Sequence, residues 1–131
     1  MTTNLFVNLP IKNLEKTVNF FTELGFEFNP KFTDETSTCM IISNSIFAML
    51  IEEDKFKTFT TKDICDSKNK TEVLLALQVE NREEVDDLVK KAIAAGGSKH
   101  MPAQDHGFMY AHSFQDIDGH IWEVFYMESE K

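Results

Sequence analysis

The sequence holds few of the residues that build covalent or metal-centred scaffolds. Its 131 residues include only two cysteines, Cys39 and Cys65, which do not form a CxxC spacing. Small disulfide-rich domains and thiolate zinc sites need more cysteines, at closer spacings. We therefore expect two free thiols and no disulfide framework.

Basic residues and long apolar runs are also scarce. Thirteen Lys and Arg residues against twenty-two Asp and Glu residues give a formal charge of -9, which repels phosphate backbones and anionic lipid. No stretch reaches the roughly 18 apolar residues of a membrane span, and the N-terminus lacks the pattern of a secretion signal. We expect no nucleic-acid partner, no membrane association and a cytoplasmic location.

Several motifs of common enzyme classes are missing. The sequence contains no GxSxG motif, no phosphate-binding glycine loop and no dinucleotide fingerprint, and neither cysteine has a histidine close in sequence. These absences exclude the corresponding nucleophilic and nucleotide-dependent enzymes.

The residues that are present suit one packed domain with an internal repeat. Hydrophobic residues make up 42% of the chain and include twelve Phe, which is enough for a core in a single domain, residues 1–131. Residues 6–13 and 74–81 both alternate apolar with other residues, as a strand does, and both end at an Asn. Asn13 and Asn81 are each followed by helical periodicity, so we expect both to cap helices.

The repeat extends through the rest of each half. The first helix is expected to carry Leu14, Val18, Phe21 and Leu24 on one stripe and to end at Gly25; the second is expected to run through Val85 to Ile93 and to end at Gly96. Three strand-like segments follow each helix, at 26–32, 36–43 and 45–52 and at 98–102, 109–114 and 120–127.

The sequence thus predicts an α+β protein of two βαβββ modules, residues 1–53 and 71–131. The polar segment 54–70 connects them. It contains eight charged residues around a few apolar ones, which fits a disordered linker, a short helix or a covering flap.

Four stretches resemble the vicinal oxygen chelate superfamily, the group of glyoxalases, bleomycin-resistance proteins and extradiol dioxygenases. They are residues 6–14, 20–26, 104–110 and 114–123, and the last is similar to the F-x-D-P-D-G-x-x-x-E motif with Ile117 in place of Pro. The resemblance is strongest to uncharacterised, lactoylglutathione lyase-like bacterial members. It implies paired βαβββ modules whose curled mixed sheets surround a concave pocket, and a homodimer.

The resemblance also implies four positions for a divalent metal, on the first and last strand of each module. In this sequence they are expected at Phe6, Ala48, Leu74 and Glu123. Only Glu123 can ligate a cation, and a lone carboxylate holds a metal weakly. We therefore expect neither a metal of the family type nor another cofactor.

The candidate pocket residues are Phe6, Asn8, Gln78, His106, Tyr110, His112 and Glu123. Glu123 is the candidate for acid–base work or for binding a cation, because a desolvated carboxylate tends towards a raised pKa. A purely structural hydrogen-bonding role for Glu123 is the alternative. His106 suits either a turn or a pocket, and the alternation of Tyr110 and His112 does not say which face they occupy.

Two functions fit this pattern. The first is binding of a small, partly apolar molecule without a metal centre. The second is a metal-dependent lyase, isomerase or dioxygenase in which Glu123 acts with His106 or His112.

Overall fold

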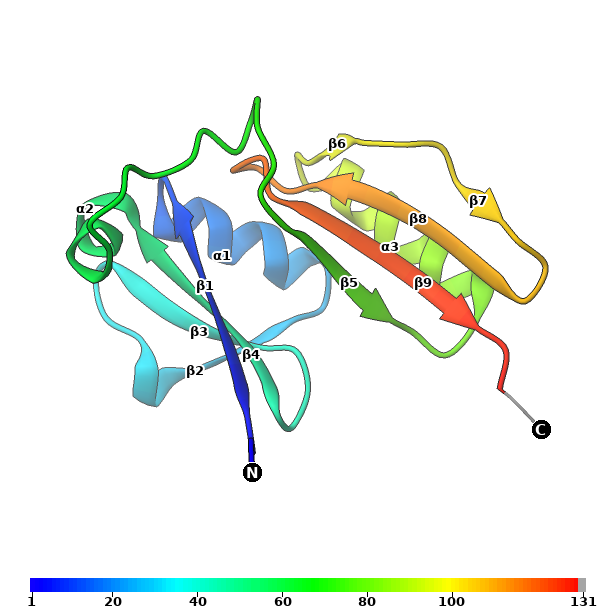
Figure 1. Ribbon diagram of the computed structural model, residues 1–131, viewed down its shortest axis with the longest axis horizontal. Helices are drawn as coiled ribbons and strands as arrows, with labels where there is room; N and C mark the ends of the chain where they lie inside the picture. The colour runs from blue at the N-terminus through cyan, green and yellow to red at the C-terminus, as the bar shows by residue number, and fades with distance from the viewer. Residues whose placement is uncertain (130–131) are drawn as a thin grey trace. The chain divides into compact units, whose positions relative to one another are not determined.

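The computed structural model describes residues 1–129 (Figure 1). The chain forms two compact units, Met1–Ile64 and the part from Cys65 onward.

The first unit is a four-stranded mixed sheet with one long helix. The sheet order is β1-β4-β3-β2, with β1 parallel to β4 and the other neighbours antiparallel. Its elements are β1 (Leu5–Ile11), α1 (Leu14–Glu23), β2 (Glu27–Asn29), the 3-10 turn η1 (Pro30–Phe32), β3 (Ser37–Ile41), β4 (Ile46–Glu52), α2 (Glu53–Phe56) and the 3-10 turn η2 (Lys57–Phe59).

The second unit repeats this order with one additional short strand. Its sheet has the order β5-β9-β8-β6, β5 runs parallel to β9, and β7 pairs with β8. Its elements are β5 (Leu74–Gln78), α3 (Arg82–Ala94), β6 (Ser98–Lys99), β7 (Gln104–Asp105), β8 (Met109–Gln115) and β9 (Ile121–Met127). The predicted α+β class with two mixed sheets is confirmed, and each sheet is open because its outermost strands do not pair with each other.

The predicted helix starts are also confirmed. The Asn13 side chain accepts a hydrogen bond from the Lys16 amide at 2.9 Å, and the Asn81 side chain accepts one from the Glu84 amide at 2.9 Å. Each Asn therefore satisfies an amide that the first helical turn leaves free.

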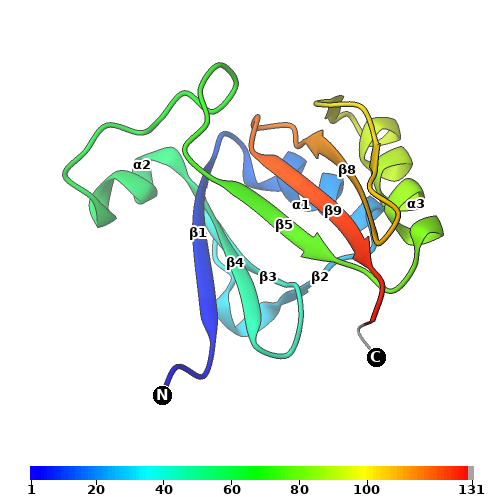
Figure 2. The same ribbon diagram turned by 45° about the vertical axis from the view of Figure 1, so that its right-hand side comes forward.

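In each unit the long helix lies on one face of the sheet, which we call the helix face. Figure 2 shows α3 along the sheet of β5, β9 and β8, where its Val85 and Val89 are buried together with Trp122 and Val124. In the first unit Val18 of α1 borders the same cavity as Thr38 of β3, which identifies the helix face there.

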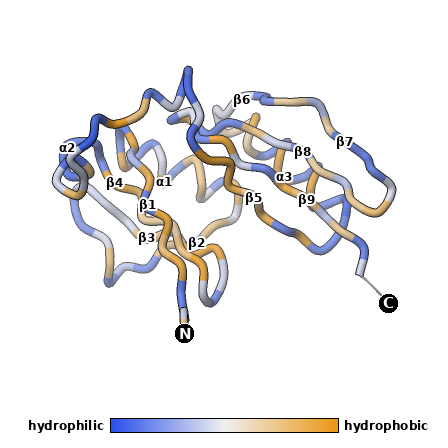
Figure 3. Tube along the Cα trace, in the orientation of Figure 1, coloured by the Kyte–Doolittle hydropathy of each residue, from blue (hydrophilic) through white to orange (hydrophobic). Residues whose placement is uncertain are grey.

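The opposite side of each sheet is called the open face. Leu9 and Ile11 of β1 are buried on the helix face, whereas Phe6 and Asn8 of the same strand are exposed on the open face. This alternation is expected because successive strand side chains point to opposite sides. Figure 3 shows that the strands carry much of the hydrophobic sequence.

Two predicted strands are shorter than expected. The segment 26–32 forms a strand only over Glu27–Asn29, because Pro30 begins a 3-10 turn in which the Asn29 side chain accepts from the Lys31 amide at 3.0 Å. The segment 98–102 is a strand only at Ser98–Lys99, and the separate strand β7 was not predicted. Proline provides no amide for pairing, so Pro102 does not extend β6.

The connection between the predicted modules is ordered at both ends. It begins with the helical turns α2 and η2, and Lys55 donates hydrogen bonds to Asp34 at 2.7 Å and to Ser37 at 3.0 Å. Near its other end the Ser67 hydroxyl donates to the Asp118 carbonyl at 2.8 Å. A short helix, one of the alternatives open from the sequence, is present at the start of this segment.

A glycine in the second unit allows a close backbone approach. Gly119 has a φ of 93°, and a Cβ atom placed on it would lie 2.7 Å from the Ser67 carbonyl oxygen. A side chain there would therefore meet both an unfavourable backbone conformation and rigid neighbouring backbone.

We expect Gly119→Ala to lower the free energy of unfolding by about 2 kcal/mol or more, because strain and steric overlap add. Gly107→Ala is the matched control, since Gly107 also has a positive φ, 82°, but no atom within 4 Å of the added Cβ. Denaturant unfolding monitored by circular dichroism measures both. Equal losses in the two variants would contradict the close-approach argument.

Candidate functional site

Glu123 occupies the open face of the second unit. It pairs with Ala76 of β5 and Ser113 of β8, which fixes the side to which all three point. Among the described strand residues of this face, Glu123 is the only ionisable one. The others are Leu74, Gln78, Ser98, Gln104, Met109, Ala111, Gln115, Ile121, Phe125 and Met127.

The Glu123 side chain is half-buried. Within residues 1–129 it forms neither a hydrogen bond nor an ion pair. Its apolar surroundings include Leu74, which is 51% exposed, and Phe125, which is half-buried. The arrangement is thus a single carboxylate on an otherwise uncharged and largely apolar surface.

The open face of the first unit is apolar as well. The rings of Phe6 and Phe47 stack with centroids 4.8 Å apart, and Phe6 remains 43% exposed. Asn8 follows on the same face, where its side-chain amide donates to the Phe6 carbonyl at 3.3 Å. Gln78 lies on the open face of the second unit, opposite Phe125.

The prediction that Ala48 points to the pocket side is wrong. Ala48 pairs with Val7 and is completely buried on the helix face. Met49, which pairs with Asn8, is the residue of β4 that corresponds to Glu123. From the sequence, Ala48 in the last strand of the first module was matched to Glu123 in the last strand of the second module. This match is displaced by one residue, and a one-residue slip exchanges the two faces of a strand.

The corrected set of family metal positions is therefore Phe6, Met49, Leu74 and Glu123. It supplies one carboxylate and no imidazole. No group of three His, Cys, Asp or Glu side chains within residues 1–129 is arranged to hold a metal ion. Tight binding of a divalent cation needs several such donors, so these residues do not fit a metal centre of the family type.

Tyr110 and His112 lie on the helix face. They pair with Tyr126 and Val124, respectively, and so point away from the side that carries Glu123. The Tyr110 hydroxyl donates to the Asp86 carboxylate at 2.6 Å, and this bond raises the pKa of Tyr110. The buried Nδ1 atom of His112 has no hydrogen-bond partner among the described residues.

His106 lies in the exposed turn between β7 and β8, where its amide donates to the Met109 carbonyl at 2.8 Å. The same turn is held by Arg82, whose guanidinium donates to both carboxylate oxygens of Asp105 at 2.9 and 3.1 Å and to the Gly107 carbonyl at 3.0 Å. Arg82 lowers the pKa of Asp105, mainly through these hydrogen bonds. Sequence reasoning missed this pair, because nothing in the pattern relates residues 23 positions apart.

The acidic motif before Glu123 has a structural role. Asp116 is buried and accepts hydrogen bonds from the amides of Asp118 and His120 and, at 2.9 Å, from the Trp122 indole. Burial raises the pKa of Asp116, while the charge of His120 and the indole hydrogen bond oppose that shift. These contacts shape the turn that leads into β9.

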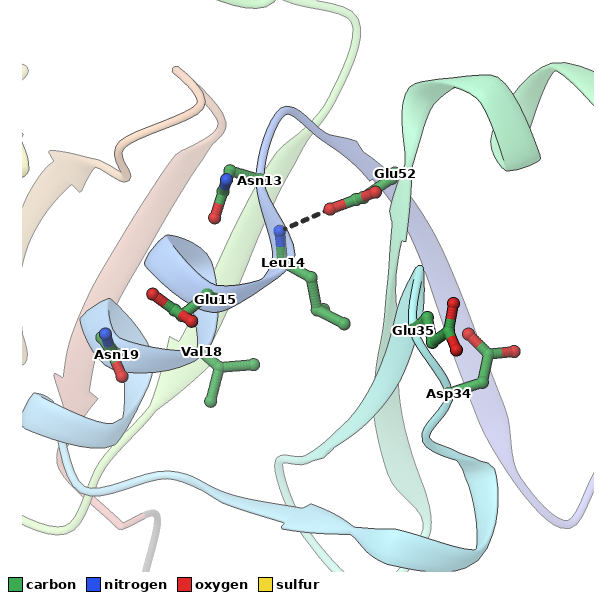
Figure 4. A pocket seen from close by; sticks show the side chains of 8 residues that line it. All are labelled: Asn13, Leu14, Glu15, Val18, Asn19, Asp34, Glu35 and Glu52. Atoms are coloured by element: carbon green, nitrogen blue, oxygen red, sulfur yellow. Dashed lines mark hydrogen bonds between the residues drawn. The ribbon is translucent and has the colours of Figure 1, made fainter.

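The first unit also has a cavity of about 410 Å³, between the start of α1 and the loop before β3 (Figure 4). Its lining residues are Asn13, Leu14, Glu15, Val18, Asn19, Asp34, Glu35 and Glu52. Two of its carboxylates have structural partners: Glu52 accepts from the Leu14 amide at 2.9 Å, and Asp34 accepts from Lys55. The Lys55 contact holds the pKa of Asp34 well below its usual range. Sequence reasoning did not identify this cavity.

Comparison with known proteins identifies the fold. Residues 5–124 match the family model described as the Glyoxalase/Bleomycin resistance protein/Dioxygenase superfamily. No curated protein matches the chain. Every helix within residues 1–129 is too short or too polar to cross a membrane.

Several solved structures are similar over nearly the whole chain. The hypothetical protein SA1046 from S. aureus is 28% identical, with a TM-score of 0.82 over 96% of this chain and 94% of that one. A glyoxalase-related enzyme from Fulvimarina pelagi is 23% identical, with a TM-score of 0.80 over 96% and 88%. The fosfomycin resistance protein FosX from Listeria monocytogenes is 20% identical, with a TM-score of 0.69 over 100% and 95%.

The contact between Lys55 and Asp34 gives a pH-dependent prediction. Because the pKa of Asp34 is lowered in the folded protein, the stabilisation is present above the unfolded value of 3.8 and is lost as the pH falls through the folded value. We expect Lys55→Met to raise the pKa of Asp34 towards 3.8, as measured by carbon-detected NMR titration of the carboxyl group. Lys57→Met is the control, since Lys57 lies 4.0 Å from Asp54 instead. An unchanged pKa of Asp34 in Lys55→Met would contradict this account.

Proposed function

Because the chain belongs to the Glyoxalase/Bleomycin resistance protein/Dioxygenase superfamily, we propose that it binds a small, partly apolar molecule on the open face of its second unit, without the metal centre. The observation that carries this proposal is the lone Glu123 on a largely apolar face. Apolar surfaces with a few polar groups are typical of small-molecule sites.

Gln78 and Glu123 are the proposed contact residues, because both lie on the open face of the second unit. Phe6 and Asn8 lie on the open face of the first unit and remain predicted contact residues there. Tyr110 and His112 are left out, since both point to the helix face. His106 is left out because it belongs to an exposed turn.

No observation favours the metal-dependent lyase, isomerase or dioxygenase. That function would need Glu123 and a histidine to meet, and His112 lies on the other side of the sheet from Glu123. The likeness to FosX, at 20% identity, supports the fold alone, so fosfomycin is not proposed as a ligand.

A homodimer and a cytoplasmic location remain predictions. For the dimer, sedimentation velocity on the full chain gives the test: a monomer at high protein concentration would contradict it.

Binding of the neutral apolar dye Nile red, followed by its fluorescence, tests the proposed function. We expect saturable binding, and an approximately fivefold weaker affinity in Leu74→Gln, because this change removes apolar contact area from the open face of the second unit. Phe32→Gln is the control, since Phe32 is 55% exposed but lies in η1, outside the open faces.

Two results would contradict the proposal. One is the lack of saturable binding by the wild-type protein. The other is an equal loss of affinity in Phe32→Gln and in Leu74→Gln, which would mean that the dye only reports exposed apolar residues.

A further inference from the structure

We propose that the ligand carries a protonated amine beside its apolar part and that Glu123 binds this amine. The inference rests on the proposed function and names the chemical class of its ligand. It starts from the finding that Glu123 is the only ionisable residue on the described strands of its face.

The negative charge of the Glu123 carboxylate has no positively charged partner among the described residues. A carboxylate that is half-buried among apolar side chains loses part of its hydration, and no Lys, Arg or His of the described chain pairs with it. A cation that arrives with the ligand would supply the missing partner. The remaining exposure of Glu123 leaves it accessible to such a group.

The neighbours of Glu123 suit an organic cation better than a metal ion. A metal ion needs several converging donors, which this face lacks. An ammonium group needs one carboxylate and hydrogen-bond acceptors, and the amide oxygen of Gln78 can provide an additional acceptor. Phe125, two residues beyond Glu123 on β9, offers an aromatic ring to the cation or to the apolar part of the ligand.

The overall charge supports the same sign of ligand. A formal charge of -9 attracts cations and disfavours anions at long range. A carboxylate ligand would in addition face Glu123 as a like charge.

Three probes with the same phenyl group separate charge from apolar contact: 2-phenylethylammonium, 2-phenylethanol and 3-phenylpropanoate. Amide chemical-shift titrations of the full chain would measure the affinity of each and locate it through the amides of Ala76 and Glu123. Because a hydrogen bond between two charged groups is stronger than one between neutral groups, we expect the ammonium compound to bind about tenfold more tightly than the alcohol. The carboxylate should bind most weakly.

The variant Glu123→Gln should reduce this preference to about threefold or less, since it keeps the shape of the side chain and removes its charge. Glu72→Gln, at an exposed position before β5, should leave the preference unchanged. A wild-type protein that binds the ammonium compound and the alcohol equally would overturn the inference, and this result does not depend on whether a variant folds. A preference that survives in Glu123→Gln would also overturn it.

These outcomes separate the inference from the proposed function. Equal binding of the alcohol and the ammonium compound, with shifts at the open face, would remove the amine and leave the proposed function intact. If the ammonium compound, the alcohol and Nile red all failed to bind to the open face of the second unit, the proposed function itself would fail.

Discussion

Burial of one long helix against one face of each sheet is the interaction on which the rest of the structure depends. In the second unit Val85 and Val89 of α3 are buried together with Trp122 and Val124 of β9. Because Trp122 and Val124 pack on the side of the helix, the alternation of strand side chains places Glu123 on the opposite side. The same rule places Phe6 and Asn8 opposite Leu9 and Ile11. The face that each candidate residue on a strand occupies therefore follows from which strand residues pack against the helix.

The two units share a scaffold and differ in the chemistry of their open faces. Met49 and Glu123 occupy corresponding positions on β4 and β9, but only the second is charged. Phe6 and Leu74, at the corresponding positions of β1 and β5, are both apolar and exposed. A scaffold can be kept by apolar burial alone, whereas a metal centre needs several donors at once. Residues 1–129 form the scaffold, but they do not bring together the donors of a metal centre.

Much of the scaffold could be predicted from the sequence because its determinants are local. The Asn13 and Asn81 caps and the alternation in β1 and β5 act within a few residues. Positions that depend on register were harder to predict. Ala48 was assigned to the wrong face because a turn of uncertain length precedes β4, and a one-residue displacement exchanges the faces.

Contacts between distant segments could not be predicted in this way. The Tyr110 bond to Asp86 and the Arg82 pair with Asp105 join residues more than 20 positions apart. Alternation shows that Tyr110 and His112 share a face, but only their pairing with β9 identifies it as the helix face. The cavity at the start of α1 could not be predicted either, because its lining residues come from distant parts of the sequence.

Among residues 1–129, Glu123 is a single carboxylate on its face and does not belong to a metal centre. Elemental analysis of protein purified without chelator, before and after addition of Ni²⁺, Zn²⁺ or Fe²⁺, distinguishes a lone carboxylate from a metal ligand. We expect far less than one equivalent of metal per chain, with no change in Glu123→Ala. One equivalent of a divalent cation that is lost in Glu123→Ala would contradict it.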